Sequence, residues 1–486
     1  MIGNETKVLR FLLFAFLLLS VLFACKDIFG PLDNPADRES ENYQGYDTIL
    51  NKDNIELFFP PVNSSLAGIP TKFIVSEVIN ASAYQIQISS SQSDFVNNIL
   101  FDKSDYASNK IDIELQSQSR GIWYYWRARA QQSGEWGKWT EISSFIIAGS
   151  FLFATGGNYD GQLGDGTTVD KSTPVEVMED VQSVSAGEYH TMIVKNDGSL
   201  WATGDNSYGQ LGDGTTVDKS TPVEVMEDVQ SVSAGGNHTM ILKNDGSLWA
   251  TGMNGDGELG DGTTVDKSTP VKVMEDVQSV SAGGYHTMIL KNDGSLWATG
   301  WNGYGQLGDG TTVDESTPVE VMEDVQSVSA GWNHTMILKN DGSLWATGMN
   351  GDGELGDGTT VDKSTPVKVM EDVQSVSAGM WHTMILKNCG NLWATGWNCY
   401  GQLGDGTYYW KSTPVKVMED VQSVSAGMWH TMILKNCGNL WATGWNCYGQ
   451  LGDGTYYWKS TPVKVMEDVQ SVSAGEYHTM IMVLSF

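Results

Sequence analysis

The sequence predicts an all-β fold in which a β-sandwich over residues 52–148 precedes a seven-bladed β-propeller over residues 151–486. Two observations support the propeller. A segment of 48 residues recurs along the second part of the chain, and each copy reads as four short strands joined by glycine-rich turns. The array also begins in the middle of one copy and ends in the middle of another, as expected for a ring that the two chain ends close together.

Residues 1–24 have the composition of an export signal. Two basic residues, Lys7 and Arg10, precede an apolar run that is too short to span a membrane comfortably. The run closes with a tetrad that resembles the lipobox of bacterial lipoproteins, Leu22-Phe23-Ala24-Cys25. The resemblance implies cleavage before Cys25 and lipid attachment to that cysteine. We therefore expect a lipid-anchored protein of the bacterial cell envelope, at the outer membrane or cell surface; a plain secretory signal and a membrane anchor are the alternatives.

The segment between the signal and the repeats divides in two. Residues 25–51 carry prolines and scattered charges without periodicity, which indicates a flexible tether. Residues 52–148 alternate apolar and polar residues in short runs typical of strands. This segment resembles a bacterial fibronectin type III module through a series of aromatic and small residues: Ala83-Tyr84, Phe95, Gly121, Tyr125 to Ala130, Trp136, Trp139 and Phe145. The resemblance implies a sandwich that acts as a spacer and has these aromatics in its core.

Each repeat is expected to contain four strands, A to D, here at 229–234, 238–243, 248–251 and 269–274. An Asp-Gly pair between B and C predicts a tight hairpin. The array starts at a strand C and ends at a strand B. Six blades are therefore continuous, and the seventh combines C and D from the start of the array with A and B from its end, which leaves no open edge.

Three motifs recur in the copies: Gly209-Gln210-Leu211-Gly212, Ser233-Ala234-Gly235-x-x-His238-Thr239 and Leu248-Trp249-Ala250-Thr251-Gly252. They closely resemble the repeats of the regulator-of-chromosome-condensation family. The resemblance spans 151–486 and implies a seven-bladed propeller. It does not imply one function, since that family includes chromatin-bound nucleotide-exchange factors, a plant ultraviolet receptor and an exported bacterial β-lactamase inhibitor.

Charge and composition narrow the function classes. The 59 acidic residues outnumber the 28 basic ones and give a net charge of -31, so a polyanion such as DNA would be repelled. One histidine per copy cannot converge on a metal at the ~2 Å bond length, so we interpret the histidines as structural. Every candidate catalytic group also recurs around the ring, whereas catalysis needs one constellation. We expect no nucleic acid partner, no metal, no cofactor and no enzymatic activity.

The copies differ mainly in the A–B and C–D connections, which lie at one end of an up-and-down blade. We therefore predict one variable face, rich in the Tyr, Trp and Asn residues that are typical of binding surfaces. Neutral drift is the alternative, because 380–427 and 428–475 are identical. The residues predicted to bind a ligand, which define the variable face, are Tyr189, Tyr208, Asn237, Tyr285, Trp301, Tyr304, Trp332, Asn333, Trp381, Trp397, Tyr400, Tyr408, Tyr409, Trp410, Trp429, Trp445, Tyr448, Tyr456, Tyr457 and Trp458.

The four cysteines of the array leave two states open. Disulfides between adjacent blades, Cys389 with Cys437 and Cys399 with Cys447, are compatible with an oxidising compartment; free thiols are the alternative. Altogether we expect a monomeric, membrane-anchored protein that binds a protein or glycan through the variable face. The alternatives are an inhibitor of an exported enzyme, similar to the propeller β-lactamase inhibitor, and a glycosidase or lyase.

Overall fold

The computed structural model describes residues 57–59, 64–66, 72–75, 78, 80–93, 95, 99–108, 110–112, 123–147 and 149–485. The chain divides into two compact units, of which the larger holds the repeats. The expected signal peptide, lipid-modified Cys25 and tether lie outside the described residues. Within the described part of the chain, no helix is long and apolar enough to cross a membrane.

The strands before the repeats form two sheets. One contains β1 (Leu57–Phe59), β3 (Lys72–Val75) and β6 (Lys110–Asp112), and the other contains β2 (Ser64–Leu66), β9 (Ser143–Ile147), β7 (Trp123–Gln132), β4 (Ala81–Ser89) and β5 (Ile99–Tyr106), with β8 (Glu135–Trp136) paired to β7. The ring of Phe73 packs edge-on against Trp126 at 4.8 Å and Phe145 at 5.9 Å, and all three are buried. Trp126 and Phe145 are therefore core residues, as expected. Trp136 and Trp139 are only partly buried and lie against the guanidinium of Arg129, so they are not core residues as the prediction had them. The relation to fibronectin type III modules stays a prediction.

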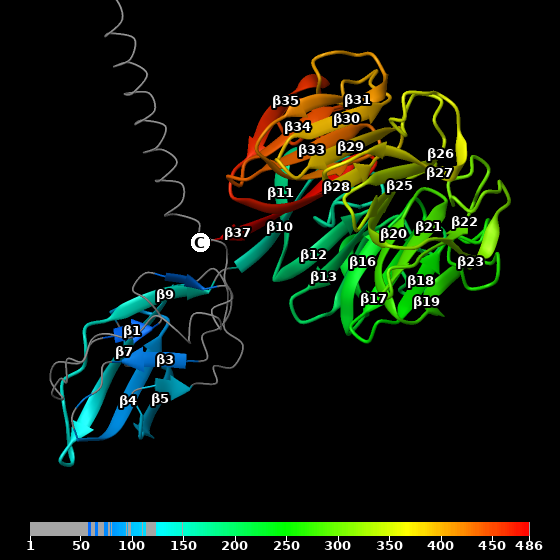
Figure 1. Ribbon diagram of the computed structural model, residues 1–486. Coiled ribbons are helices and arrows are strands. Elements are labelled where there is room, and N and C mark those ends of the chain that lie inside the picture. The colour runs from blue at the N-terminus through cyan, green and yellow to red at the C-terminus, as the bar shows by residue number, and fades with distance from the viewer. Residues whose placement is uncertain are drawn as a thin grey trace, which may run out of the picture. The chain divides into compact units, whose positions relative to one another are not determined.

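Residues 149–485 form seven four-stranded antiparallel sheets, arranged around a common axis (Figure 1). Six of these sheets, or blades, are each built from four consecutive strands. In chain order they contain β12 (Val181–Ala186), β13 (His190–Lys195), β14 (Leu200–Gly204) and β15 (Lys219–Met226); β16 (Val229–Ala234), β17 (His238–Lys243), β18 (Leu248–Gly252) and β19 (Lys267–Met274); β20 (Val277–Ala282), β21 (His286–Lys291), β22 (Leu296–Gly300) and β23 (Glu315–Met322); β24 (Val325–Ala330), β25 (His334–Lys339), β26 (Leu344–Gly348) and β27 (Lys363–Met370); β28 (Val373–Ala378), β29 (His382–Lys387), β30 (Leu392–Gly396) and β31 (Lys411–Met418); β32 (Val421–Ala426), β33 (His430–Lys435), β34 (Leu440–Gly444) and β35 (Lys459–Met466).

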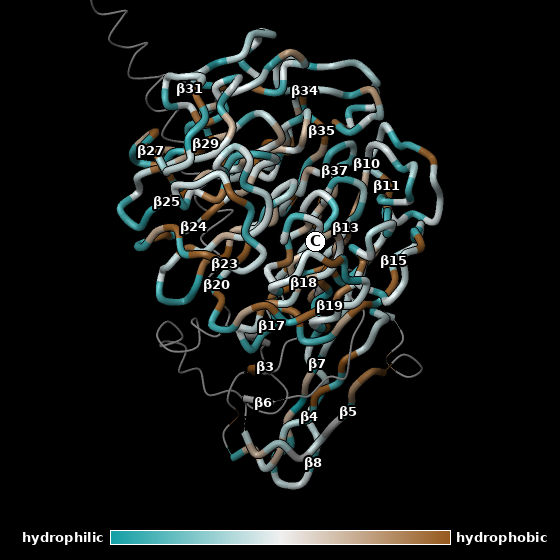
Figure 2. Tube along the Cα trace, turned by 90° about the vertical axis from the view of Figure 1, so that its right-hand side faces the viewer, coloured by the Kyte–Doolittle hydropathy of each residue, from teal (hydrophilic) through white to brown (hydrophobic). Residues whose placement is uncertain are grey.

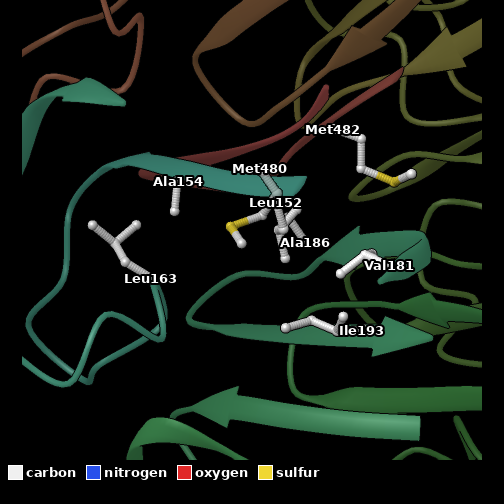
Figure 3. Close-up of a cluster of buried hydrophobic side chains, with 8 residues drawn as sticks. All are labelled: Leu152, Ala154, Leu163, Val181, Ala186, Ile193, Met480 and Met482. Atoms are coloured by element: carbon white, nitrogen blue, oxygen red, sulfur yellow. The ribbon is translucent and has the colours of Figure 1, made fainter. Parts of the chain in front are cut away.

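The seventh sheet, the closure blade, joins the two ends of the array. Its order is β11 (Lys171–Glu179), β10 (Gly149–Gly156), β37 (His478–Ser485) and β36 (Val469–Ala474). β10 pairs with β37 along its whole length, from Gly149 opposite Ser485 to Gly156 opposite His478. Side chains from both ends of the array then pack on the first continuous blade, as Leu152 and Met480 do beside Ile193 (Figure 3). The ring therefore has no unpaired sheet edge between its first and last strands.

Each blade is apolar on both sides, because it packs between two others. Met240 and Leu242 of β17 enter the core shared with the following blade, whereas the intervening Ile241 enters the core shared with the preceding blade. Hydrophobic and hydrophilic residues are consequently interspersed along the chain (Figure 2). This explains why the strands lack the simple alternation of a half-exposed sheet.

A closed ring of hydrogen bonds links the seven blades. The imidazole Nε2 of each repeat histidine lies 2.8 to 2.9 Å from the hydroxyl of a threonine in the next blade: His190–Thr239, His238–Thr287, His286–Thr335, His334–Thr383, His382–Thr431, His430–Thr479 and His478–Thr191. The histidines are fully buried. The structural role expected for them is therefore a bond between blades, which sequence periodicity alone could not specify.

The ring also determines the protonation of the histidines. The Thr239 hydroxyl donates its one proton to the carbonyl oxygen of Gln210, so it accepts from His190 Nε2–H. Burial lowers the pKa of His190 to about 4 and of His238 to about 3. Both imidazoles are therefore neutral, and each carries its proton on Nε2.

We predict that replacing Thr287 by Val destabilises the propeller. The substitution keeps the side-chain shape but leaves the buried His238 Nε2–H without an acceptor and the Glu258 carbonyl without a donor. Unfolding in urea should show a loss of roughly 1–3 kcal/mol. Thr264→Val, at an exposed position of the neighbouring loop, is the control and should change stability by less than about 0.5 kcal/mol. Equal effects of the two variants would contradict the role assigned to the ring.

Candidate ligand-binding face

The A–B turns and C–D loops meet at one end of each blade. The backbone N–H that follows strand C donates to a carbonyl of the A–B turn in the same blade, as Met253 does to Asn237 and Trp301 does to Tyr285, both at 2.8 Å. The variable residues of the A–B turn and of the C–D loop therefore adjoin one another. Because these contacts are made by backbone atoms, they persist whichever side chains occupy the variable positions.

Constant residues hold each C–D loop in one conformation. In the first continuous blade, Asn206 is fully buried; its amide donates to Asp213 at 3.0 Å and its oxygen accepts from the Leu211 N–H at 3.0 Å. Asp213 also pairs with Lys219 at 3.2 Å. The loop aspartates are thus engaged by protein groups, and the described residues contain no group of three or more His, Cys, Asp or Glu side chains that could hold a metal.

A glycine in the same loop is required by the neighbouring blade. Gly209 has a φ of +80°, and a Cβ on it would lie 2.5 Å from Ser268 Cα in the next blade. A side chain there would be strained and would force the two blades apart. The loop conformation and the contact between blades therefore constrain each other.

Ring contacts join many aromatic residues of the variable face into two clusters, which also include Tyr477, a residue that the sequence prediction missed. The larger one spans several blades and contains Trp397, Trp381, Trp429, Tyr400, Trp445, Trp458, Tyr448, Tyr477 and Tyr189. The smaller one contains Tyr304, Trp301, Tyr285 and Trp332. Most contacts are edge-to-face with centroids about 5 to 6 Å apart, which is the favoured geometry of aromatic pairs. The rings are therefore held rigidly before any ligand arrives.

Exposure differs among the predicted binding residues. Tyr409 and Tyr457 are 76% and 77% exposed, and several others are more than one third exposed: Tyr208, Tyr304, Tyr408, Trp410, Tyr448, Tyr456 and Trp458. A second group is partly buried within the clusters: Tyr189, Tyr285, Trp301, Trp332, Trp381, Trp397, Tyr400, Trp429 and Trp445. Asn237 is also partly buried, outside the clusters. Asn333 is 8% exposed, so its side chain is not accessible to a ligand on this surface, in contrast to the prediction. Its amide instead lies against the sulfur of Met349.

Two copies give up a structural hydrogen bond for an aromatic residue. In five copies an aspartate before strand D accepts from the backbone N–H of the loop asparagine: Asn158–Asp170, Asn206–Asp218, Asn254–Asp266, Asn302–Asp314 and Asn350–Asp362, at 2.8 to 2.9 Å. Trp410 and Trp458 occupy this position in the other two copies, and a tryptophan cannot accept the bond. Both rings remain about half exposed. The aromatic residues therefore replace a bond that stabilises the loop without becoming buried.

The structure also brings together two carboxyl groups that the predicted site did not include. Glu188 and Glu476 lie in the A–B turns of the first continuous blade and the closure blade, where the A–B turns of all seven blades line a small pocket. Burial, followed by the adjoining Glu476, raises the pKa of Glu188, and burial also raises the pKa of Glu476. Glu188 is therefore protonated at neutral pH, beside the carboxyl group of Glu476. The sequence signal was the shared Glu-Tyr dipeptide in the first and last A–B turns, combined with ring closure.

This carboxyl pair does not have glycosidase geometry. The two carboxyl groups adjoin each other, because their A–B turns are joined by a hydrogen bond from the Glu476 N–H to the Gly187 carbonyl. The acid and the nucleophile or base of a glycosidase are about 5 Å or more apart, because a sugar or a water must fit between them. The pair is suited to sharing a proton.

The four cysteines of the repeats are free and exposed. The Cys447 sulfur accepts from the indole N–H of Trp445 at 2.8 Å and of Trp458 at 3.2 Å. The disulfides kept open by the sequence are not formed in this structure. Cys447 instead connects two tryptophans of the variable face.

Family comparisons agree with the repeat architecture. The model described as an RCC1-like domain matches residues 272–484. The regulator of chromosome condensation (RCC1) repeat matches 151–194, 197–242 and 245–290, and a second model of that repeat matches 181–210 and 229–258. Residues 151–484 are therefore built from RCC1-type repeats, as predicted. A comparison with curated proteins found no match.

Solved structures show the same propeller fold. The human WBSCR16 structure has a TM-score of 0.64 and 21% identity over 69% of this chain and 99% of that one. Yeast RCC1 (Prp20), solved bound to Kap60, has a TM-score of 0.62 and 20% identity over 69% and 89% of the two chains. Prp20p from Saccharomyces cerevisiae, described together with its binding to Gsp1p and histones, has a TM-score of 0.61, with 21% identity over 68% and 91%. At these identities the similarity establishes the RCC1-like propeller and nothing finer.

Buried glutamates in two C–D loops create a pH dependence. Glu258 and Glu354 are fully buried where the other copies have glutamine, and burial raises the pKa of each to about 7 from an ordinary value of 4.5. Between these pH values the folded state keeps the proton that the unfolded state has released. The stability contributed by the protonated form is therefore lost as the pH rises toward 7.

We predict that the double variant Glu258→Gln, Glu354→Gln is more stable than the parent at pH 8 and equally stable at pH 4.5. The gain at pH 8 should be at most about 3 kcal/mol per site, from the shift in pKa. Urea unfolding at the two pH values measures it. The reverse change in another blade, Gln306→Glu, should destabilise the protein at pH 8 only. A gain from the double variant that does not depend on pH would refute the explanation.

Proposed function

We propose that the protein is an exported, membrane-anchored binding protein whose variable face recognises a protein or a glycan. The observation that carries the proposal is the exchange of a loop hydrogen bond for half-exposed tryptophans at Trp410 and Trp458. Neutral drift in a duplicated repeat would not favour large exposed aromatic residues, because they lower the stability and the solubility of the protein. Ligand recognition supplies such a reason, because exposed Trp and Tyr side chains are efficient binding residues.

Rigidity of the face supports the same conclusion. The clustered rings are held by edge contacts and by loops whose backbone is fixed, so little conformational entropy would be lost on binding. RCC1-like propellers commonly mediate protein interactions, and yeast RCC1 has been solved bound to the protein Kap60. A protein ligand is therefore the first candidate. Flat aromatic rings also suit the faces of sugars, which makes a glycan the second.

The proposed location follows from the first part of the sequence. A lipid on Cys25 would anchor the chain, and residues 26–51 together with the two-sheet unit would separate the repeats from the membrane. Such a position suits a protein that presents one face to ligands outside the cytoplasm. Globomycin-sensitive processing and labelling with radioactive palmitate, both lost in Cys25→Ala, would test it; a chain that is processed and extracted identically with Ala at position 25 would exclude a lipid anchor.

The main test restores the common loop sequence in two blades. We predict that Tyr408→Thr, Tyr409→Val, Trp410→Asp together with Tyr456→Thr, Tyr457→Val, Trp458→Asp weakens ligand binding at least tenfold. The six changes remove exposed rings and recreate the aspartate that accepts the loop N–H bond in the other copies, so the fold is preserved. Binding is measured by pull-down from envelope and host extracts and on a glycan array, with hits confirmed by calorimetry.

A matched control addresses the opposite end of the blades. Glu371→Ala and Glu419→Ala remove exposed carboxylates that pair with Lys368 and Lys416 in the D-strand ends. This control should bind like the parent. If the six-fold aromatic variant retains every interaction of the parent, the binding role of the variable face is wrong.

A further inference from the structure

A cleft of about 490 Å³ opens on the variable face at the closure blade. It is lined by four tyrosines from three different blades, Tyr159, Tyr189, Tyr448 and Tyr477, and by the carboxylates of Asp160 and Asp170. No lysine or arginine lines it. The cleft thus combines aromatic rings with negative charge.

The cleft results from two residues that differ from all other copies. Gly157 stands where the other blades have Asp, Met or Trp, as at Trp301 and Trp445, so the space filled there by a large side chain is left open. Tyr159 stands where the others have Ser, Gly or Cys, and it is 86% exposed. This copy therefore has no side chain to fill the space and has an exposed ring at its rim.

Two tyrosines beside the cleft adjoin the carboxyl pair. Tyr189 and Tyr477 lie 5.5 Å apart between ring centroids. Burial, followed by the adjoining Glu476, raises the pKa of both phenols. Tyr448 packs edge-on against Tyr477 at 5.2 Å. These rings are held in place without blocking the cleft.

Negative charge at the cleft is not compensated within the propeller. Asp160 lies close enough to Asp205 and Asp218 for their charges, after burial, to raise its pKa to about 6. Neither Asp160 nor Asp170 forms an ion pair with any described residue, unlike the loop aspartate Asp165, which pairs with Lys171 at 3.1 Å. An external cation would relieve this repulsion and contact the ring faces at the same time.

We propose that this cleft is a subsite for the cationic side chain of a lysine or arginine in a protein partner. The inference rests on the proposed binding role of the variable face and assigns a chemistry to one part of it. Four rings and two carboxylates give an organic cation both the aromatic and the ionic contacts that it prefers. A neutral or anionic side chain would gain no ionic contact there, and the carboxylates would repel the anion.

The test uses the purified full-length protein and two short peptides, acetyl-Gly-Gly-Lys-Gly-Gly-amide and the same peptide with norleucine in place of lysine. Saturation-transfer NMR and chemical-shift titration at low ionic strength measure binding. The lysine peptide should bind at least fivefold more tightly than the norleucine peptide, and its affinity should fall as salt is added. An arginine peptide should behave like the lysine peptide.

Variants locate the binding. Asp160→Asn and Tyr159→Ser should each weaken the lysine peptide roughly threefold to tenfold, by loss of an ionic or a ring contact. Asp352→Asn changes the equivalent position of another blade, outside the cleft, and should have no effect. Gly157→Met, which fills the cleft with the residue found at Met253 and Met349, should abolish binding.

Each contrary result overturns a distinct statement. Equal affinity for the lysine and norleucine peptides, or no binding of either, excludes cation recognition by the cleft and leaves the aromatic face to the separate pull-down and array. Binding that survives the cleft variants but disappears when Tyr408–Trp410 and Tyr456–Trp458 are exchanged places the cation elsewhere on the face. If that exchange abolishes binding of every macromolecular partner but leaves binding of the lysine peptide intact, both the binding role of the variable face and the cation subsite are supported.

Discussion

The hydrogen bond between a buried histidine and a threonine of the next blade is the contact on which the repeat array depends. A single blade has apolar residues on both sides and cannot bury them alone. The Thr239 hydroxyl accepts from His190 and donates to the carbonyl of Gln210. One hydroxyl therefore links its blade to both a B strand and a C–D loop of the preceding blade. The same bond that orders the ring thus sets the position of the loops that form the variable face. The burial that keeps each imidazole neutral is part of this arrangement, because a charged ring would cost too much in that interior.

Much of the fold could be predicted because the same strand and turn pattern recurs in every repeat. The 48-residue period, the Asp-Gly hairpins and the half-copies at the two ends lead to seven sheets, and β10 does pair with β37. The location of the variable loops at one end follows from strand order. The sequence could not show which of those side chains are exposed. Asn333 is buried beside Met349, although Trp332 in the same turn is partly exposed. The identity of an asparagine does not indicate which way its side chain points.

Contacts between distant copies were also beyond prediction. Glu188 and Glu476 are far apart in sequence and become partners only because the last A–B turn lies beside the first. Glu258 and Glu354 resemble ordinary surface acids in sequence, yet they occupy the buried position of a glutamine. The cleft forms because Gly157 has no side chain. The importance of this glycine is visible only in comparison with the Met and Trp residues at the same position in other blades. Such features result from packing across blades, which a single copy does not contain.

The split closure blade has a genetic consequence. Residues 380–427 and 428–475 are identical, so unequal crossing-over between such copies would insert or delete one whole unit in register. The half-copies at the two ends carry β10 and β37, and an exchange among the internal units leaves their pairing intact. Every recombinant therefore retains a closing strand, whatever the number of blades between its ends. Recombination can thus add, remove or replace whole 48-residue units, while the β10–β37 pairing that closes the ring is unchanged.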